Sequence, residues 1–192
     1  KLQELADDPD VKGIVVPVET DPAVDAAYDA WDLEYCYVLE ANRVAEAVRD
    51  LVQQYVNDPA NDIQYVVIAG TDAVIPFYRV QDEVEISNES DFVDGLFVDP
   101  ITPLAWALSG GEVNGKAYGF ISTDDIYTAD DPLFFRSRQL FVPDRAGGRL
   151  VETPEEIMLT IDNFLTGGNV QVDTCLVTSY DFLLDSGTAI ND

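Results

Sequence analysis

The stretch from residue 38 to residue 56 most constrains the fold, because its side chains repeat with the period of an α-helix. Apolar and charged residues fall on opposite faces of that helix: Val44, Val48, Leu51, Val52 and Tyr55 on one, and Glu40, Arg43, Glu46, Arg49 and Asp50 on the other. DPAND at 58–62 then breaks the helix, and QYVVIAG at 64–70 is typical of a buried strand. The apolar, β-branched run at 12–19 predicts an earlier strand. Strand, helix and strand in this order predict a parallel pair with a right-handed crossover.

Further elements follow from local signals along the rest of the chain. Asn114 and Gly115 between apolar runs predict a β-hairpin, since both residues tolerate positive φ. Thr153, followed by Pro154 and two glutamates, predicts a helix that Gly167 ends. The other expected elements are a helix at 22–31, a strand at 118–122, an acidic loop after it, an extended segment at 138–144 and a last strand at 172–180. The economical interpretation is a single α/β domain over residues 1–192.

Charge excludes several classes of function. The chain has 37 Asp and Glu against 10 Lys and Arg, a net charge of −27 and no His. Such a charge repels nucleic acid and anionic lipid, and no apolar run is long enough to cross a bilayer, so we expect neither nucleic-acid binding nor membrane insertion. Without His, a Ser-His-Asp triad or a Cys-His dyad cannot be built from these residues alone. The acidity fits either an extracellular, cation-rich setting or an acidic soluble domain. Cys36 and Cys175 leave a disulfide and a buried thiol as alternatives.

A phosphate-loop pattern is present but incomplete. Gly110, Gly115 and Lys116 fit G-x-x-x-x-G-K, yet Ala117 stands where a magnesium-binding Ser or Thr is required. A strand rather than a helix is expected to follow, so the pattern favours a hairpin.

Four carboxylates gather directly after the strand at 118–122: Asp124, Asp125, Asp130 and Asp131. If that strand is parallel to its neighbours, this loop lies at the edge of the sheet where α/β proteins bind ligands. Neighbouring carboxylates repel, and a cation relieves the repulsion. The cation could be calcium, a substrate Lys or Arg, or an internal arginine such as Arg136 or Arg149; a solvated acidic loop is the alternative. Asp72, just past the strand at 64–70, has a similar position and a weaker case.

Three segments, in this order, resemble the first half of a gingipain-type, caspase-like cysteine peptidase domain. They are VVIAGTDAVIPF (66–77), STDDIY (122–127) and VPDRAGGRLVETPEEI (142–157). The resemblance covers roughly residues 62–185 and implies a three-layer α/β sandwich with a mostly parallel sheet and an inserted hairpin. Two departures are Thr71, which separates Gly70 from Asp72, and Gly147, where the family usually has an apolar residue.

The resemblance also implies a function. The family's catalytic His and Cys lie on later strands, so these residues would be the N-terminal part of a secreted or cell-surface peptidase, inactive as an isolated chain. The end at TAIND, after a strand and a helix start, likewise suggests a piece of a longer protein. Its partners would be a peptide or protein substrate and the remainder of the parent chain.

The resemblance assigns roles to several residues. Asp124 or Asp125 would receive a basic substrate residue or support the catalytic His. Gly148 and Arg149 would be structural, with Arg149 pairing an acid. The resemblance itself implies no cofactor; calcium is suggested by the acidic cluster alone, with Asp130 and Asp131 as the candidate ligands. The alternative is a non-catalytic, calcium-binding structural or binding module of an acidic surface protein.

Overall fold

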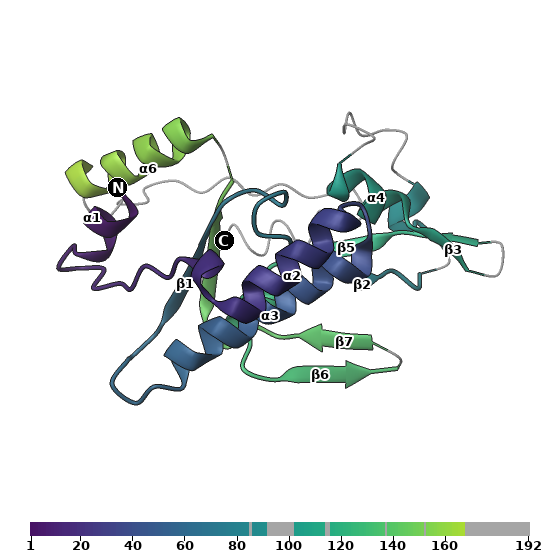
Figure 1. Cartoon of the computed structure of the whole chain (residues 1–192), viewed down its shortest axis with the longest axis horizontal. Helices are drawn as coiled ribbons and strands as arrows, with labels where there is room; N and C mark the ends of the chain where they lie inside the picture. Colours follow the sequence, from purple (N-terminus) through teal and green to yellow (C-terminus); the bar gives the residue numbers. More distant parts are fainter. Residues whose placement is uncertain (85, 92–101, 114–115, 137, 152, 168–192) are drawn as a thin grey trace, which may run out of the picture. The chain divides into compact units, whose positions relative to one another are not determined.

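The computed structural model describes all residues except 85, 92–101, 114–115, 137, 152 and 168–192 (Figure 1). The chain divides into two compact units, one of residues 1–14 and 158–192, the other of residues 15–157. The predicted last strand at 172–180 and Cys175 lie outside the described residues. Within the described residues, no helix is both long enough and apolar enough to cross a membrane.

The smaller unit contains α1 (Leu2–Ala6) and most of α6 (Pro154–Gly167). An ion pair of 2.8 Å between Lys1 Nζ and an Asp162 oxygen joins them. The predicted start of α6 is confirmed by a capping box. The backbone N–H of Glu156 donates to Thr153 Oγ1 (3.4 Å), and the Glu156 carboxylate accepts from the Thr153 N–H (3.1 Å) and hydroxyl (2.6 Å). These bonds lower the pKa of Glu156.

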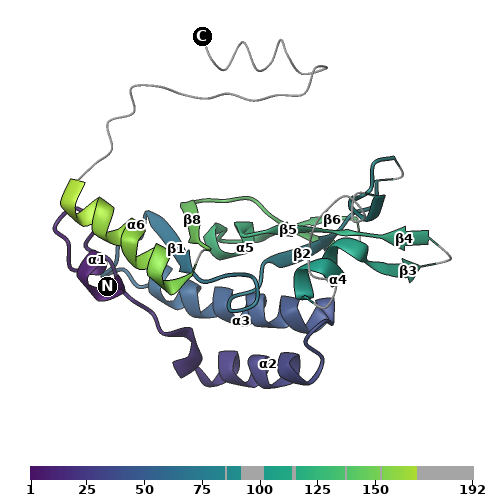
Figure 2. The same cartoon turned by 90° about the horizontal axis from the view of Figure 1, so that it is seen from above.

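Two helices of the larger unit confirm the helices predicted at 22–31 and 38–56. They are α2 (Pro22–Leu33), with Asp21 as its N-cap, and α3 (Val38–Val56). The helices lie side by side (Figure 2). Their buried side chains are Val24 and Trp31 on α2 and Ala41, Val44, Ala45, Val48 and Leu51 on α3.

The predicted strand at 64–70 is confirmed as β1 (Tyr65–Ala69), but its partner differs from the expected one. β1 pairs in parallel with β8 (Ala146–Leu150), with Val67 opposite Gly148. The predicted strand at 12–19 is wrong: the segment has no strand, and a 3-10 helix, η1, covers Val18–Thr20. Lys12 has a φ of 51° and Ile14 is 47% exposed, so the apolar run neither keeps extended geometry throughout nor is buried.

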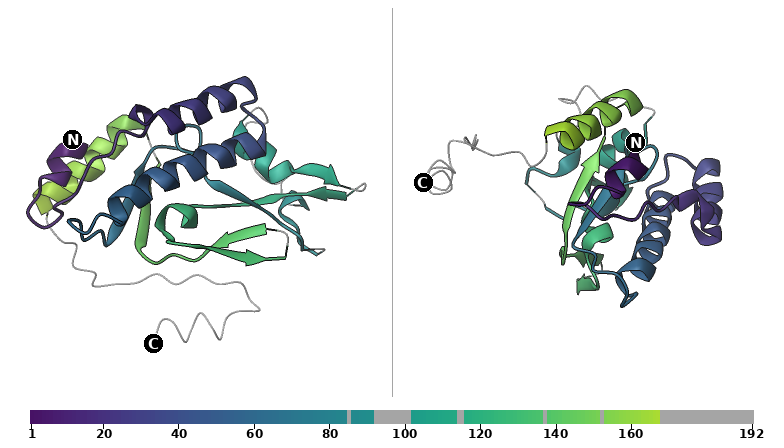
Figure 3. Two further views of the ribbon diagram at one scale, coloured as in Figure 1. Left: turned by 60° about the horizontal axis from the view of Figure 1, so that its bottom comes forward. Right: turned by 90° about the vertical axis from the view of Figure 1, so that its left-hand side faces the viewer.

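The other strands pair antiparallel. The pairs are β2 (Tyr78–Gln81) with β5 (Phe120–Thr123), β3 (Gly111–Val113) with β4 (Lys116–Tyr118), and β6 (Pro132–Phe135) with β7 (Arg138–Phe141). The β3–β4 pair confirms the predicted hairpin, although residues 114–115 themselves lie outside the described residues. α4 (Pro103–Ser109) precedes it. Among the described residues the fold is therefore mixed α/β (Figure 3), with parallel pairing between β1 and β8.

The acidic segment after β5 differs from the expected loop. It forms a short helix, α5 (Asp125–Thr128), and leads into β6. Ile126 and Tyr127 of α5 are fully buried in a core shared with α2, α3, β1, β2 and β7. The predicted ligand site required the acids to follow a parallel strand. β5 is instead antiparallel to β2, so this requirement is not met.

Candidate functional site

Arg149 of β8 joins three segments that are distant in the sequence. Its Nε donates to Asp124 Oδ2 (2.8 Å) and its Nη2 to Asp124 Oδ1, a two-pronged ion pair. Its Nη1 donates to the carbonyls of Gly70 and Ile75, both at 2.8 Å. The guanidinium also lies 4.2 Å from the centre of the Phe77 ring. With its side chain only 5% exposed, Arg149 fixes the segment after β1 to the start of α5.

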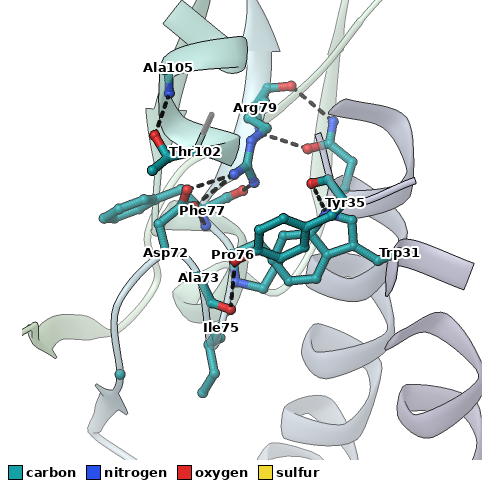
Figure 4. A network of polar contacts seen from close by, with 12 residues as sticks. Trp31, Tyr35, Asp72, Ala73, Ile75, Pro76, Phe77, Arg79, Thr102 and Ala105 are labelled. Atoms are coloured by element: carbon teal, nitrogen blue, oxygen red, sulfur yellow. Dashed lines mark hydrogen bonds and ion pairs between the residues drawn. The ribbon is translucent and has the colours of Figure 1, made fainter. Parts of the chain in front are cut away.

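A second buried ion pair holds the same segment from the opposite end. Arg79 of β2 donates from Nη2 to both Asp72 oxygens (2.9 and 2.8 Å) and from Nη1 to the Phe77 carbonyl (2.6 Å) (Figure 4). The Phe77 N–H donates to Asp72 (2.8 Å). Burial lowers the pKa of Arg79, whereas the Asp72 charge favours its protonated form. Asp72 is thus a structural partner rather than a free acid.

Three tyrosines complete the anchoring of residues 70–77. The hydroxyl of Tyr28 donates to the Val74 carbonyl (2.6 Å), and that of Tyr127 donates to the Pro76 carbonyl. Tyr35 reaches the Ala73 carbonyl at 3.5 Å. Burial raises the pKa of Tyr28 to about 12 and also raises that of Tyr127. Side chains from α2, α5, β2 and β8 therefore hold this segment in one conformation.

A hollow of about 190 Å³ lies beside this anchored segment. Its lining residues come from the end of β5, α5, the approach to β8 and β8 itself: Asp124, Asp125, Thr128, Pro143, Gly147 and Gly148. A Cβ on Gly147 would come within 2.7 Å of Thr128 Cγ2, so only glycine allows β8 to approach α5 this closely. A Cβ on Gly148 would meet nothing within 4 Å.

The two predicted substrate-binding acids occupy different positions in this hollow. The Asp124 carboxylate is occupied by Arg149, which confirms that Arg149 pairs an acid. The Asp125 carboxylate accepts no hydrogen bond within the described part of the chain. Asp125 is therefore the acid of this hollow that forms no ion pair within the described part of the chain.

The predicted metal-binding acids are not among the residues that line the hollow. Arg145 donates to both oxygens of Asp130, and these bonds lower the pKa of Asp130. Asp131 is exposed. The other suggested internal arginine, Arg136, pairs with Glu83 at 3.3 Å instead of with the acidic cluster. In the described ranges no group of three Asp, Glu, Cys or His side chains could hold a metal ion, and calcium binding by Asp130 and Asp131 stays a prediction.

Sequence reasoning missed several anchoring residues: Arg79, Arg145, Tyr28 and Tyr127. The sequence did carry a signal for the arginines. Because the chain has only 10 Lys and Arg against 37 acids, each arginine is a candidate partner for a buried acid. No comparable signal marks the tyrosines, since their hydroxyl contacts depend on the packing of helices far away in the sequence.

Comparisons with known proteins do not place the chain in a family: no family model, curated protein or solved structure matches it.

Proposed function

We propose that these residues form the N-terminal part of a caspase-like cysteine endopeptidase domain in which Asp125 receives a basic side chain of the substrate. Asp124 takes the structural role in this proposal, because Arg149 occupies both of its oxygens. The sequence left open which of the two acids binds the substrate. The proposal assigns substrate binding to Asp125 and structural support to Asp124.

The observation that carries the proposal is the convergence at Arg149. The three segments that resemble the peptidase family are far apart in the sequence, and Gly70 and Arg149 are 79 positions apart. Arg149 belongs to the third segment, its carbonyl acceptors to the first and Asp124 to the second. Segments that resemble one family and also build one buried cluster support a common origin for all three.

The exposed face of β1 supports the three-layer sandwich that the proposal includes. Tyr65 and Val67 are 73% and 55% exposed, whereas Ile68 is buried. Parallel strands of α/β proteins are generally covered on both faces, so an apolar face of this kind favours a further layer.

The chemistry requires groups from outside these residues. A Cys thiolate, activated by a His, would attack the peptide carbonyl carbon; the amine leaves with a proton from the His, and water then hydrolyses the thioester. The present chain has no His, so it would contribute substrate binding and support. The Coulomb attraction of a guanidinium or ammonium group about 4 Å from Asp125 is about 4 kcal/mol at an effective dielectric constant near 20, and desolvation of the two charges offsets part of it.

The test replaces Asp125 by Asn in a parent polypeptide that supplies the catalytic His and Cys. We expect kcat/KM for cleavage after Arg or Lys to fall about 10- to 100-fold, because a charge-assisted contact is lost. Asp131→Asn is the matched control, since it removes the same charge from an exposed acid nearby. Unchanged cleavage by Asp125→Asn would refute the role of Asp125. A parent without a His and a Cys on later strands would refute the peptidase itself.

The alternative function is a non-catalytic module of an extracellular or cell-surface protein that binds calcium. The charge of −27 favours it, as do the carboxylates of Asp125 and Asp131, which have no ion-pair partner among the described residues. The neutralisation of Asp124 and Asp130 by arginines does not favour it. A calcium site would raise the melting temperature, since calcium at 100 times its dissociation constant adds about 2.7 kcal/mol. If sodium at matched ionic strength raised the melting temperature equally, the effect would be general screening of the negative charges and not a calcium site.

A further inference from the structure

The outer strand of the β6–β7 hairpin leaves large apolar side chains in solvent. β7 lies beside β2, where Arg138 donates to the Gln81 carbonyl, and β6 is the far strand of the hairpin (Figure 1). Within the described residues β6 pairs with β7 alone. Leu133, Phe134 and Phe135 are 55%, 73% and 49% exposed. An exposed apolar edge strand is a template for pairing with another strand, and proteins usually protect such edges with charge or cover them.

The same segment differs from the rest of the chain in charge. From Pro132 to Pro143 the sequence has no Asp or Glu and two arginines, in a protein that has 37 acids. Two copies of so acidic a chain repel each other over most of their surfaces. The hairpin is a place where two copies can meet without bringing carboxylates together.

The ends of β6 carry opposite charges. Asp131 directly precedes the strand and Arg136 directly follows it. Both are exposed, and the Arg136 side chain is 68% exposed although it pairs with Glu83. In an antiparallel pair of identical strands, the start of each strand lies beside the end of the other. The acidic start of one β6 would therefore meet the basic end of its partner, and symmetry repeats the attraction at the other end.

From these observations we infer that β6 is a self-association edge, which pairs antiparallel with β6 of a second copy of this chain. Four residues a strand give a small interface, so the dimer is weak and forms only at high protein concentration. This inference is independent of the proposed peptidase function.

Sedimentation velocity over a concentration series from 1 to 500 µM tests the inference at physiological salt. We expect the chain to shift from monomer to dimer over this range, and Phe134→Ser to weaken association at least 10-fold. Leu33→Ser is the matched control, because Leu33 is 86% exposed on α2 and distant in sequence from the hairpin. A monomer at every concentration, or equal effects of both substitutions, would overturn the inference.

A charge exchange tests the antiparallel arrangement separately, in a Glu83→Gln background because Glu83 pairs with Arg136 within one copy. Asp131→Arg and Arg136→Asp should each weaken the dimer, because each places like charges opposite one another. The double variant should restore association, since the two charges have changed places. Failure of the double variant to recover, with circular dichroism spectra unchanged, would exclude this arrangement.

Discussion

Two arginines bind the two halves of the acidic segment, and they do so in different surroundings. Arg149 binds Asp124 with side-chain exposures of 5% and 28%, whereas Arg145 binds Asp130 with exposures of 17% and 45%. Arg149 also satisfies two carbonyls of the segment after β1, while Arg145 satisfies the carbonyl of Ile63. Breaking a buried pair leaves an uncompensated charge, whereas water replaces the partner of an exposed one. In the sequence both pairs join an aspartate of the segment 124–131 to an arginine of the segment 145–149. Their expected contributions to the free energy of unfolding nevertheless differ several-fold.

The largest effect is expected from Arg149→Ala. We expect it to lower the free energy of unfolding by about 3–5 kcal/mol, because Asp124 loses its counter-charge in a partly buried site and two carbonyls lose their donor. Urea unfolding followed by circular dichroism measures the change. Arg43→Ala is the matched control, since Arg43 is 64% exposed and pairs with Glu40 on the surface of α3, and it should cost less than about 1 kcal/mol. Equal losses in both variants would remove the distinction between buried and exposed pairs.

A smaller loss of stability is expected from Tyr127→Phe. Tyr127 lies in the sequence between Asp124 and Asp130. Loss of its hydroxyl leaves the Pro76 carbonyl without this donor, so we expect a cost of about 1–2 kcal/mol at neutral pH.

Alkaline pH provides a second measurement on the same residue. Burial raises the pKa of Tyr127 above its unfolded value of about 10, so the contribution of Tyr127 to stability is constant below about pH 10 and falls at higher pH, where the unfolded state ionises first. Tyr127→Phe should show a shallower fall above pH 10. The same alkaline slope in both proteins would place the responsible ionisation at another group.

The smallest effect is expected from Arg145→Ala, at about 0.5–1 kcal/mol at pH 7. Its pH dependence has a defined sign. Because the pKa of Asp130 is lowered in the folded state, the pair stabilises the protein above the unfolded pKa of about 4 and loses that contribution as pH falls through the folded value. Wild type and variant should therefore converge in acid. A difference that persists at pH 2 would assign the stabilisation to the Ile63 contact instead.

Local signals predicted the helices well. The bounds of α3 agree with the amphipathic stretch at 38–56, and the Thr153 capping box begins α6 as expected. Helical periodicity and caps act over a few residues, so the sequence carries them directly. The run at 12–19 shows the opposite case: its apolar, β-branched residues suit a strand, but no strand forms, because a strand needs a partner that propensity cannot supply.

Strand β8 was not predicted, because it has a partner strand but little strand propensity of its own. Its sequence, AGGRL, has little intrinsic strand preference, yet it supplies the parallel partner of β1. The glycines that weaken the prediction also allow close packing against α5, at Gly147 and Thr128. Non-local contacts therefore override local preference at this position.

The sequence by itself determined the composition of the site, and the tertiary structure decided how the roles are divided. Charge, the absence of His and the cluster at 124–131 are sequence properties, and they already restricted the chemistry to carboxylates and cations. Only the fold placed Arg149 against Asp124 and Arg145 against Asp130, leaving Asp125 and Asp131 without a partner among the described residues. The physical reason is that ion pairing acts over a few ångströms in space, between residues that the chain itself separates widely.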